Sequence, residues 1–181
     1  MTAVRDGDLA QLGPLFDFLS RVTGDRHAAE DLVQDIFVRI LKYRATFRDD
    51  GRFETWLYRI ARNARADYFR TRAPQDPLAE DALERPESAP GPVRQLEALR
   101  DRLRLKRALM RLREDKRELI VLARFQGMKH ERIAELLGIE VGAVKVRIHR
   151  ALRELRDIFD EIPDGNATWD VKSSGRTLQI I

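Results

Sequence analysis

The chain has 181 residues, of which 43% are hydrophobic and 35% are charged, a composition that favours packed helices with long solvated faces. The absence of cysteine excludes a disulfide framework and a thiolate metal site, and the three scattered histidines do not form a zinc-binding set. No apolar run approaches the ~20 residues that cross a bilayer, and the N-terminal segment has no apolar signal-peptide core. We therefore expect a cytoplasmic protein with no membrane insertion, no bound metal and no cofactor.

Apolar residues recur at helical spacing through most of the chain, which predicts an all-α fold. The segment LAQLGPLFDFLSRVTGDR predicts a helix that ends near Thr23 and Gly24, with Pro14 marking a helix start or break. A stronger periodic pattern begins at Glu30 and predicts a long second helix with apolar residues at Leu32, Val33, Ile36, Phe37, Ile40 and Leu41. Gly51 then predicts a turn over residues 47–52.

Residues 52–72 interleave six arginines with large aromatic side chains, among them Phe53, Trp56 and Phe69. Two acids oppose the arginines, so the segment has a net charge of +4. Arginines neutralise phosphates and aromatic rings stack on exposed bases, so the combination predicts contact with DNA strands that are separated or being separated. The alternative is that Trp56 and Tyr68 are core residues with the arginines in solvent, and the aromatic residues alone do not decide between the two.

Composition changes abruptly over residues 73–92, which hold five of the seven prolines and five acids against the single base Arg85. Proline removes backbone donors and biases its neighbours toward extended conformations, so this stretch predicts a flexible acidic linker. We therefore predict two small helical domains, a linker between them and a tail of unknown role, with boundaries at 1–72, 73–94, 95–160 and 161–181.

The helical pattern resumes near Val93. Asp115 followed by Glu118 resembles a capping box, which predicts that a new helix starts there and ends near Gly127. Two further helices flank Gly138, because glycine tolerates the positive φ of a tight helix–helix corner. The sequence thus predicts a helix-turn-helix at the end of the second domain.

The second helix of this pair has a buried side, formed by Val144, Ile148, Leu152 and Leu155, and a polar outer side. The outer side holds Gly142, Lys145, Val146, His149, Arg150 and Arg153. Residues 141–156 have a net charge of +4, so we expect two basic patches, one in each domain. A small N-terminal residue and a basic outer face suit the DNA major groove, and a solvated basic face on a helical hairpin is the alternative.

Two segments carry a resemblance to a known family. DLVQDIFVRILKYRATFRDDGRFETWLYRIARNARADYFR resembles the second region of bacterial RNA polymerase sigma factors, and FQGMKHERIAELLGIEVGAVKVRIHRALREL resembles their fourth region. The order of the two segments and the acidic linker between them resemble the small group-four, extracytoplasmic function (ECF) type. The resemblance covers residues 5–160 and implies a sigma factor that binds core polymerase and directs promoter-specific transcription initiation.

The resemblance also implies roles for individual residues. The sigma-factor segment that docks on the clamp helices of the polymerase β′ subunit matches Asp31, Leu32, Gln34, Asp35 and Phe37. The resemblance also implies a second contact, with the β flap of the polymerase. The loop at 47–53 matches the one that captures a flipped base. The helix that grips and melts the minus-ten element matches Phe53, Trp56, Arg59, Arg62, Asn63 and Arg65. The minus-thirty-five readers match Lys145, Val146, Arg147, His149 and Arg150. An anti-sigma factor is a further candidate partner.

The chain departs from the family pattern at several positions. The first helix is shorter than is usual, and Met128 and Lys129 replace the hydroxyl residue that caps the first helix of the helix-turn-helix. Ala143 and Val146 stand where threonine and serine are frequent, which affects phosphate contacts and minus-thirty-five preference rather than the fold.

Two other function classes compete with this interpretation. An autonomous helix-turn-helix regulator would bind duplex DNA tightly without polymerase, but it would not need DLVQDIF or the aromatic–arginine helix. An enzyme is disfavoured because the sequence has no cysteine, no glycine-rich phosphate loop and no histidine–carboxylate cluster.

Overall fold

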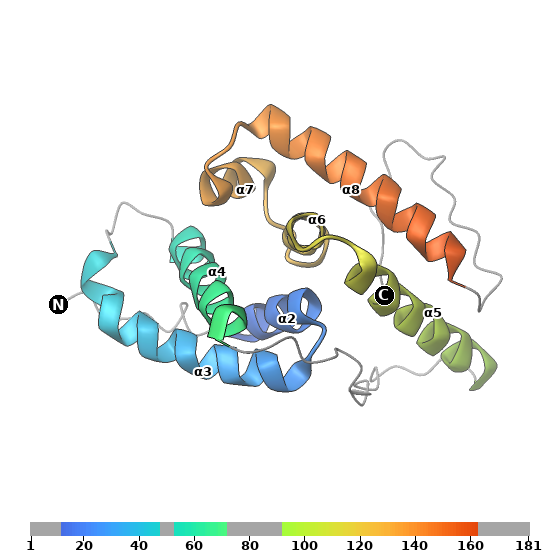
Figure 1. Cartoon of the computed structure of the whole chain (residues 1–181), viewed down its shortest axis with the longest axis horizontal. Coiled ribbons are helices and arrows are strands. Elements are labelled where there is room, and N and C mark those ends of the chain that lie inside the picture. The colour runs from blue at the N-terminus through green and yellow to red at the C-terminus, as the bar shows by residue number, and fades with distance from the viewer. Residues whose placement is uncertain (1–11, 48–52, 72–91, 163–181) are drawn as a thin grey trace.

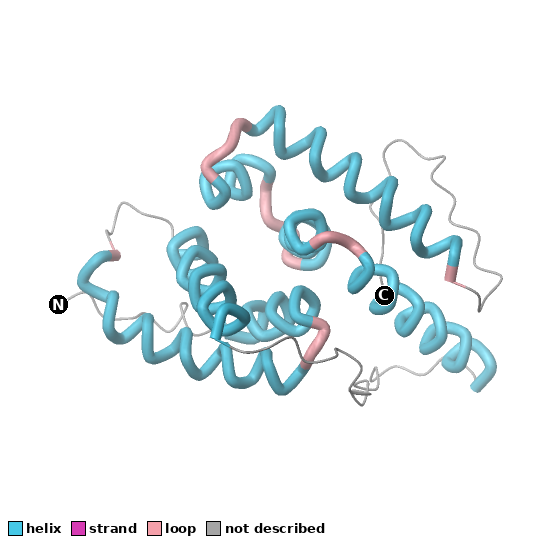
Figure 2. The backbone as a smooth tube through the Cα atoms, in the orientation of Figure 1, coloured by secondary structure: helices cyan, strands magenta, loops and turns pink. Residues whose placement is uncertain are grey.

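The computed structural model describes residues 12–47, 53–71 and 92–162 (Figure 1). Every regular element in these ranges is a helix (Figure 2), which confirms the all-α prediction. The first unit contains α2 (Leu12–Thr23), α3 (Arg26–Tyr43), the short η1 (Arg44–Thr46) and α4 (Phe53–Thr71). The second unit contains α5 (Pro92–Arg111), α6 (Glu114–Ile120), η2 (Val121–Phe125), α7 (His130–Leu137) and α8 (Val141–Glu161).

The end of α2 is set by Gly24, as the sequence predicts. Gly24 adopts φ +74°, a conformation that favours glycine. The next residue, Asp25, caps α3 because its side chain accepts a hydrogen bond from the Ala28 amide at 3.1 Å. Pro14 lies in the first turn of α2, where a missing backbone N–H costs little.

The first unit buries one side of each of its three long helices. Phe18 of α2 meets the ring of Tyr58 of α4 edge to face, with centroids 5.0 Å apart. The remaining core of the unit is aliphatic, and it includes Leu15, Leu19, Leu32, Ile36, Leu57, Ala61 and Ala64. Apolar residues at helical spacing line the contacts between α2, α3 and α4, although Phe37 and Leu41 of the periodic pattern in α3 are exposed.

The second unit confirms the helix-turn-helix. Gly138 ends α7 at φ +65°, and the Ile139 amide donates to the Ala134 carbonyl at 3.1 Å across the corner. The capping-box prediction is wrong: α6 begins at Glu114, and Asp115 lies inside it, paired with Arg113 at 2.7 Å. The helix continues as the π-helical turn η2 and ends at Phe125, two residues before Gly127, whose φ is +61°.

The two units pack against each other. In Figure 1, α6 lies between α8 and the helices of the first unit, and α7 lies beside α4. One continuous apolar cluster contains Leu57 and Tyr58 of α4 together with Val121 and Leu122 of η2. The sequence predicts two helical domains, and the structure adds a shared core that periodicity within single helices does not reveal.

We predict that Gly24→Ala destabilises the chain by about 1–3 kcal/mol, because a β-carbon at this φ is strained. A β-carbon here would also lie 2.3 Å from Sδ of Met110 in α5. Urea denaturation measures the loss. Gly13→Ala is the control, since a β-carbon there meets nothing within 4 Å; equal stability of the two variants would contradict the prediction.

Candidate nucleic-acid and partner interfaces

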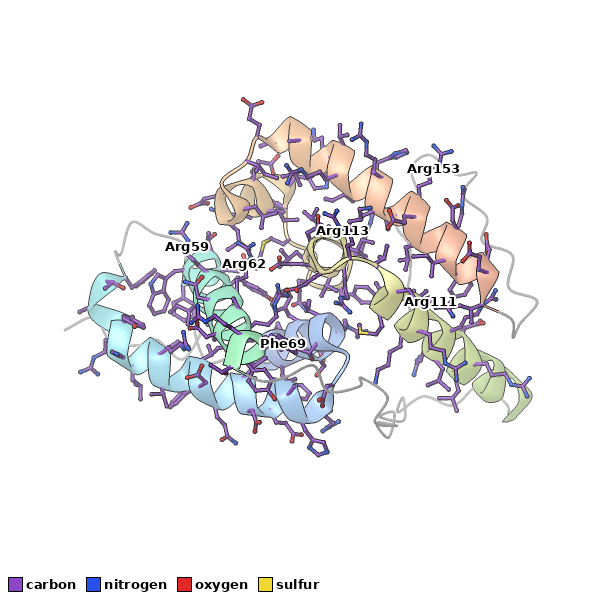
Figure 3. The ribbon with its side chains drawn as sticks, viewed as in Figure 1. Arg59, Arg62, Phe69, Arg111, Arg113 and Arg153 are labelled. Carbon is purple, nitrogen blue, oxygen red and sulfur yellow. The ribbon has the colours of Figure 1, made fainter. Side chains whose placement is uncertain are left out.

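The outer face of α8 is solvent-exposed and basic. Val144 and Ile148 anchor the helix from below, in the core that it forms with α7. All five minus-thirty-five candidates lie on the exposed surface: Lys145, Val146, Arg147, His149 and Arg150. Arg147, which is not on the outer side given by periodicity, is exposed with the others. Arg153 extends the same surface along the outer side of α8 (Figure 3).

The outer face of α3 combines acids with exposed apolar side chains. Asp31, Gln34 and Asp35 are exposed, and Phe37 keeps 45% of its surface in solvent. Two further exposed residues, Val38 at 62% and Leu41 at 48%, extend the apolar part beyond the residues predicted from the sequence. Exposed apolar side chains beside acids are typical of a partner-binding surface. We call these six residues of α3 the α3 surface: Asp31, Gln34, Asp35, Phe37, Val38 and Leu41.

Leu32 does not belong to the α3 surface. Its side chain is 0% exposed, packed with Ile36 beneath the outer face. The prediction that Leu32 contacts a partner directly is therefore wrong for this structure. The cause is helical geometry, because Leu32, Ile36 and Ile40 are spaced by four residues and share the inner side of α3.

An ion-pair network joins α3 to α4 at the edge of the α3 surface. Arg39 donates to Asp35 at 2.9 Å on its own helix and to Asp67 of α4 at 2.8 Å. The hydrogen bond from Arg39 lowers the pKa of the Asp67 carboxyl, and the same bond raises the pKa of Arg39. The network fixes the orientation of Asp35, one of the predicted docking residues.

Three aromatic rings gather at the start of α4. Phe47, Phe53 and Trp56 form a triangle with centroids 5.4 to 5.7 Å apart. Phe53 and Trp56 are half-buried: each packs against the core and keeps part of its surface in solvent. Their burial is therefore compatible both with a core role and with contact to DNA. Residues 48–52, most of the loop predicted to capture a flipped base, lie outside the described residues.

The polar minus-ten candidates of α4 fall into two groups. Arg59 and Asn63 are exposed, as predicted. Arg62 is 34% exposed and donates to Glu118 of α6 at 2.8 Å (Figure 3). Arg65 is only 7% exposed and pairs with Glu114 of α6 at 2.6 Å. In this arrangement two carboxylates of α6 already pair with Arg62 and Arg65, so neither guanidinium is free for a DNA strand.

A third basic segment was missed in the sequence. Helix α5 holds seven basic residues against Glu97 and Asp101, a larger excess than either predicted patch. Arg107 and Arg111 are exposed, whereas Arg104 is buried over the Phe159 ring with its guanidinium carbon 4.2 Å from the centroid. Counting charge across the expected start of the second domain would have revealed this segment.

Comparisons with known proteins place both units in one family. The family description "Sigma-70 region 2" matches residues 10–75, and "Sigma-70, region 4" matches residues 102–155. The chain is 35% identical over 139 residues to ECF RNA polymerase sigma factor SigE of Mycolicibacterium smegmatis, a match covering 76% of this chain and 54% of that protein. It is 35% identical over 153 residues to ECF RNA polymerase sigma factor ShbA of Streptomyces griseus, covering 79% and 78%.

A solved structure agrees with this similarity. CnrH, determined in complex with the cytosolic domain of CnrY, superposes with a TM-score of 0.61 at 30% identity, covering 85% of this chain and 86% of that one. Within the residues that the structure describes, no helix has the length and apolarity to span a bilayer. The same residues contain no group of histidines and acids arranged to hold a metal ion.

We predict that Leu32→Ala lowers the stability of the fold far more than Phe37→Ala does. Removing the buried Leu32 side chain lowers the free energy of unfolding by about 2–5 kcal/mol, since the core cannot refill the cavity fully. Removing the exposed Phe37 side chain changes it by less than about 0.5 kcal/mol. Chemical denaturation followed by circular dichroism measures both, and a large loss for Phe37→Ala would show that it is a core residue.

Proposed function

Since this chain belongs to the extracytoplasmic function sigma factors of the sigma-70 family, which bind core RNA polymerase and direct promoter-specific transcription initiation, we propose how its helices divide that work. The first unit docks on the polymerase and opens the minus-ten element. The second unit reads the minus-thirty-five element. The observation that supports this proposal most directly is the nature of two exposed faces. The face of α3, in the region 2 match, is acidic and apolar, and the face of α8, in the region 4 match, is basic.

The α3 surface is the proposed docking site for the β′ clamp helices. Phe37, Val38 and Leu41 supply apolar area, and Asp31 and Asp35 supply negative charge for a basic partner helix. Leu32 contributes from beneath by holding α3 in place. A second contact, between the second unit and the β flap, completes the proposed attachment.

The proposed minus-ten site is the aromatic–arginine side of α4. Unstacking a base step costs a few kcal/mol, and stacking a base on an aromatic ring returns about 1–3 kcal/mol. Phe53 and Trp56 are partly exposed and are the candidates for that stacking. Arg59, Arg62 and Arg65 offer phosphate contacts, and Asn63 offers an amide for a base edge. Several contacts must act together to hold a melted strand, which explains why the polymerase is needed to align them.

The proposed minus-thirty-five reader is α8. Lys145, His149 and Arg150 are candidates for base or phosphate contacts, and Arg147 for a phosphate contact. Val146 is exposed and apolar, so it suits a thymine methyl group. Gly142 near the N-terminus of α8 lets the helix approach the groove closely.

Location and further partners follow from this role. We infer that the chain acts in the cytoplasm, where core polymerase and promoter DNA are found. The similar protein CnrH is bound to the cytosolic domain of CnrY, which supports the idea that a separate protein chain regulates this one too. An anti-sigma factor therefore stays a predicted partner.

The deciding experiment is in vitro transcription with core polymerase on a promoter library. We expect specific transcripts only when this chain and the core enzyme are both present. Tight binding of duplex DNA at a two-fold symmetric site without polymerase would instead favour the autonomous regulator.

Asp35→Lys should abolish capture of core enzyme because it reverses a charge on the α3 surface. Asp17→Lys, an equal change at an exposed position of α2, should not.

We predict that Arg150→Ala weakens promoter duplex binding by about 1–3 kcal/mol and relaxes preference at one position of the minus-thirty-five element. The measurement is holoenzyme affinity for a set of single-base promoter variants. Arg156→Ala is the control, because Arg156 is further along α8 and pairs with Asp157 at 3.4 Å. Unchanged preference in the Arg150 variant would remove it from the readers.

A further inference from the structure

The junction between α4 and α6 contains the most deeply buried charges that the structure describes. Glu118 of α6 is 5% exposed and accepts from Nε of Arg62 at 2.8 Å. Its second carboxylate oxygen lies 3.7 Å from Nη2 of Arg65. Glu114, one turn earlier on α6, lies 2.6 Å from the same nitrogen. We call these four residues the latch: Arg62, Arg65, Glu114 and Glu118.

The latch occupies groups that the proposed function assigns to DNA. A guanidinium presents the same donors to a carboxylate and to a phosphate, so one arginine cannot serve both fully at once. Arg62 and Arg65 lie on successive turns of α4, and the two carboxylates lie on successive turns of α6. The glutamates therefore stand where two phosphates of a bound strand would be held.

Other contacts close the units around the latch. The Tyr58 hydroxyl donates to Oε1 of Gln126 at 2.9 Å, and burial raises the pKa of Tyr58, so it remains protonated. Arg21 of α2 lies over the Phe125 ring, with its guanidinium carbon 4.4 Å from the centroid. These contacts sit between the first unit and the π-helical turn η2, and they hold α6 against α4.

The closed arrangement leaves part of its hydrogen bonding unmade. Nε and Nη1 of Arg65 are buried and, within the described residues, have no hydrogen-bond partner. A third guanidinium, Arg117, is close by: burial lowers its pKa, Glu114 raises it and Arg65 lowers it. Two glutamates thus balance the charges of three arginines. The donors without acceptors reduce the stability of the closed arrangement of the two units. Such a contact can be opened by a competitor that supplies more acceptors.

We propose that Glu118, assisted by Glu114, is an internal phosphate mimic that closes the second unit over the minus-ten site, so that the free chain binds single-stranded DNA weakly until the units separate. The proposal rests on the proposed function, because it takes Arg62 and Arg65 to be strand-binding residues. The α3 surface stays exposed in the closed chain, on the side of the first unit away from α6 (Figure 1). Polymerase can therefore dock first, and separation of the units then releases the arginines for the promoter.

The test combines a distance measurement with a DNA-binding measurement on the full chain. The sequence has no cysteine, so Ala45→Cys and Ala98→Cys introduce two exposed dye sites, one in η1 of the first unit and one in α5 of the second. Energy transfer between the dyes reports separation of the units. Fluorescence anisotropy with a labelled oligothymidylate reports binding of single-stranded DNA over a series of salt concentrations.

Glu118→Gln keeps the shape of the side chain and removes its charge. We expect energy transfer to fall and affinity for oligothymidylate to rise about tenfold, as for a closed state that holds nine-tenths of the molecules. The salt dependence of log K should also steepen by about 0.7 for each newly engaged phosphate. Asp115→Asn makes the same charge change at an exposed position of α6, and it should alter neither energy transfer nor the salt slope.

Gln126→Ala provides a second route to opening, because it removes the acceptor of the Tyr58 hydroxyl and leaves every arginine in place. It should lower energy transfer and raise affinity in the same direction as Glu118→Gln. Unchanged energy transfer in both variants would overturn the latch and leave the proposed function standing. Reduced energy transfer with an unchanged salt slope would overturn the phosphate mimicry and remove Arg62 and Arg65 from the proposed minus-ten site.

Discussion

The buried carboxylate of Glu118 constrains how the two units are arranged. A charge at that depth is tolerated only beside opposite charges, and α4 supplies two: Arg62 donates a hydrogen bond to Glu118 at 2.8 Å, and Arg65 lies 3.7 Å from it. The positions of α4, α6 and the apolar core between them are consistent with the need to keep opposite charges beside the Glu118 carboxylate. Because the same arginines are proposed to hold a melted strand, the closed packing of the free chain and its DNA binding compete for one set of donors.

The two faces proposed to contact polymerase and duplex DNA both remain exposed. They are the α3 surface and the outer face of α8. The strand-binding side of α4 is partly covered, with Arg59 and Asn63 outside and Arg65 inside. The proposed roles then imply an order of events: docking and duplex recognition are available to the closed chain, whereas gripping a melted strand requires the units to separate.

Particular residues show where sequence reasoning succeeds and where it stops. Gly24 and Gly138 were identified as turn positions, because positive φ is a local property that few residues other than glycine accept. Leu32 and Arg65 were assigned to partners although both are buried, since a family match aligns positions and does not report burial in this packing. Asp115 and Glu118 have the spacing of a capping box, yet the structure uses Glu118 to bind another helix. Local spacing cannot reveal a partner that lies 56 residues away.

The sequence by itself determined the helices, the order of the two regions, the helix-turn-helix corner and the family, because these depend on periodicity, turn residues and motifs within short windows. The exposed outer face of α8 also followed from periodicity, whereas the assignment of its residues as minus-thirty-five readers came from the family resemblance. Only the tertiary structure decided which arginines of α4 are available, and that α2 and α4 share a core with η2. The reason is physical: burial and ion pairing between distant helices depend on the docking of whole surfaces, which no single helical period encodes.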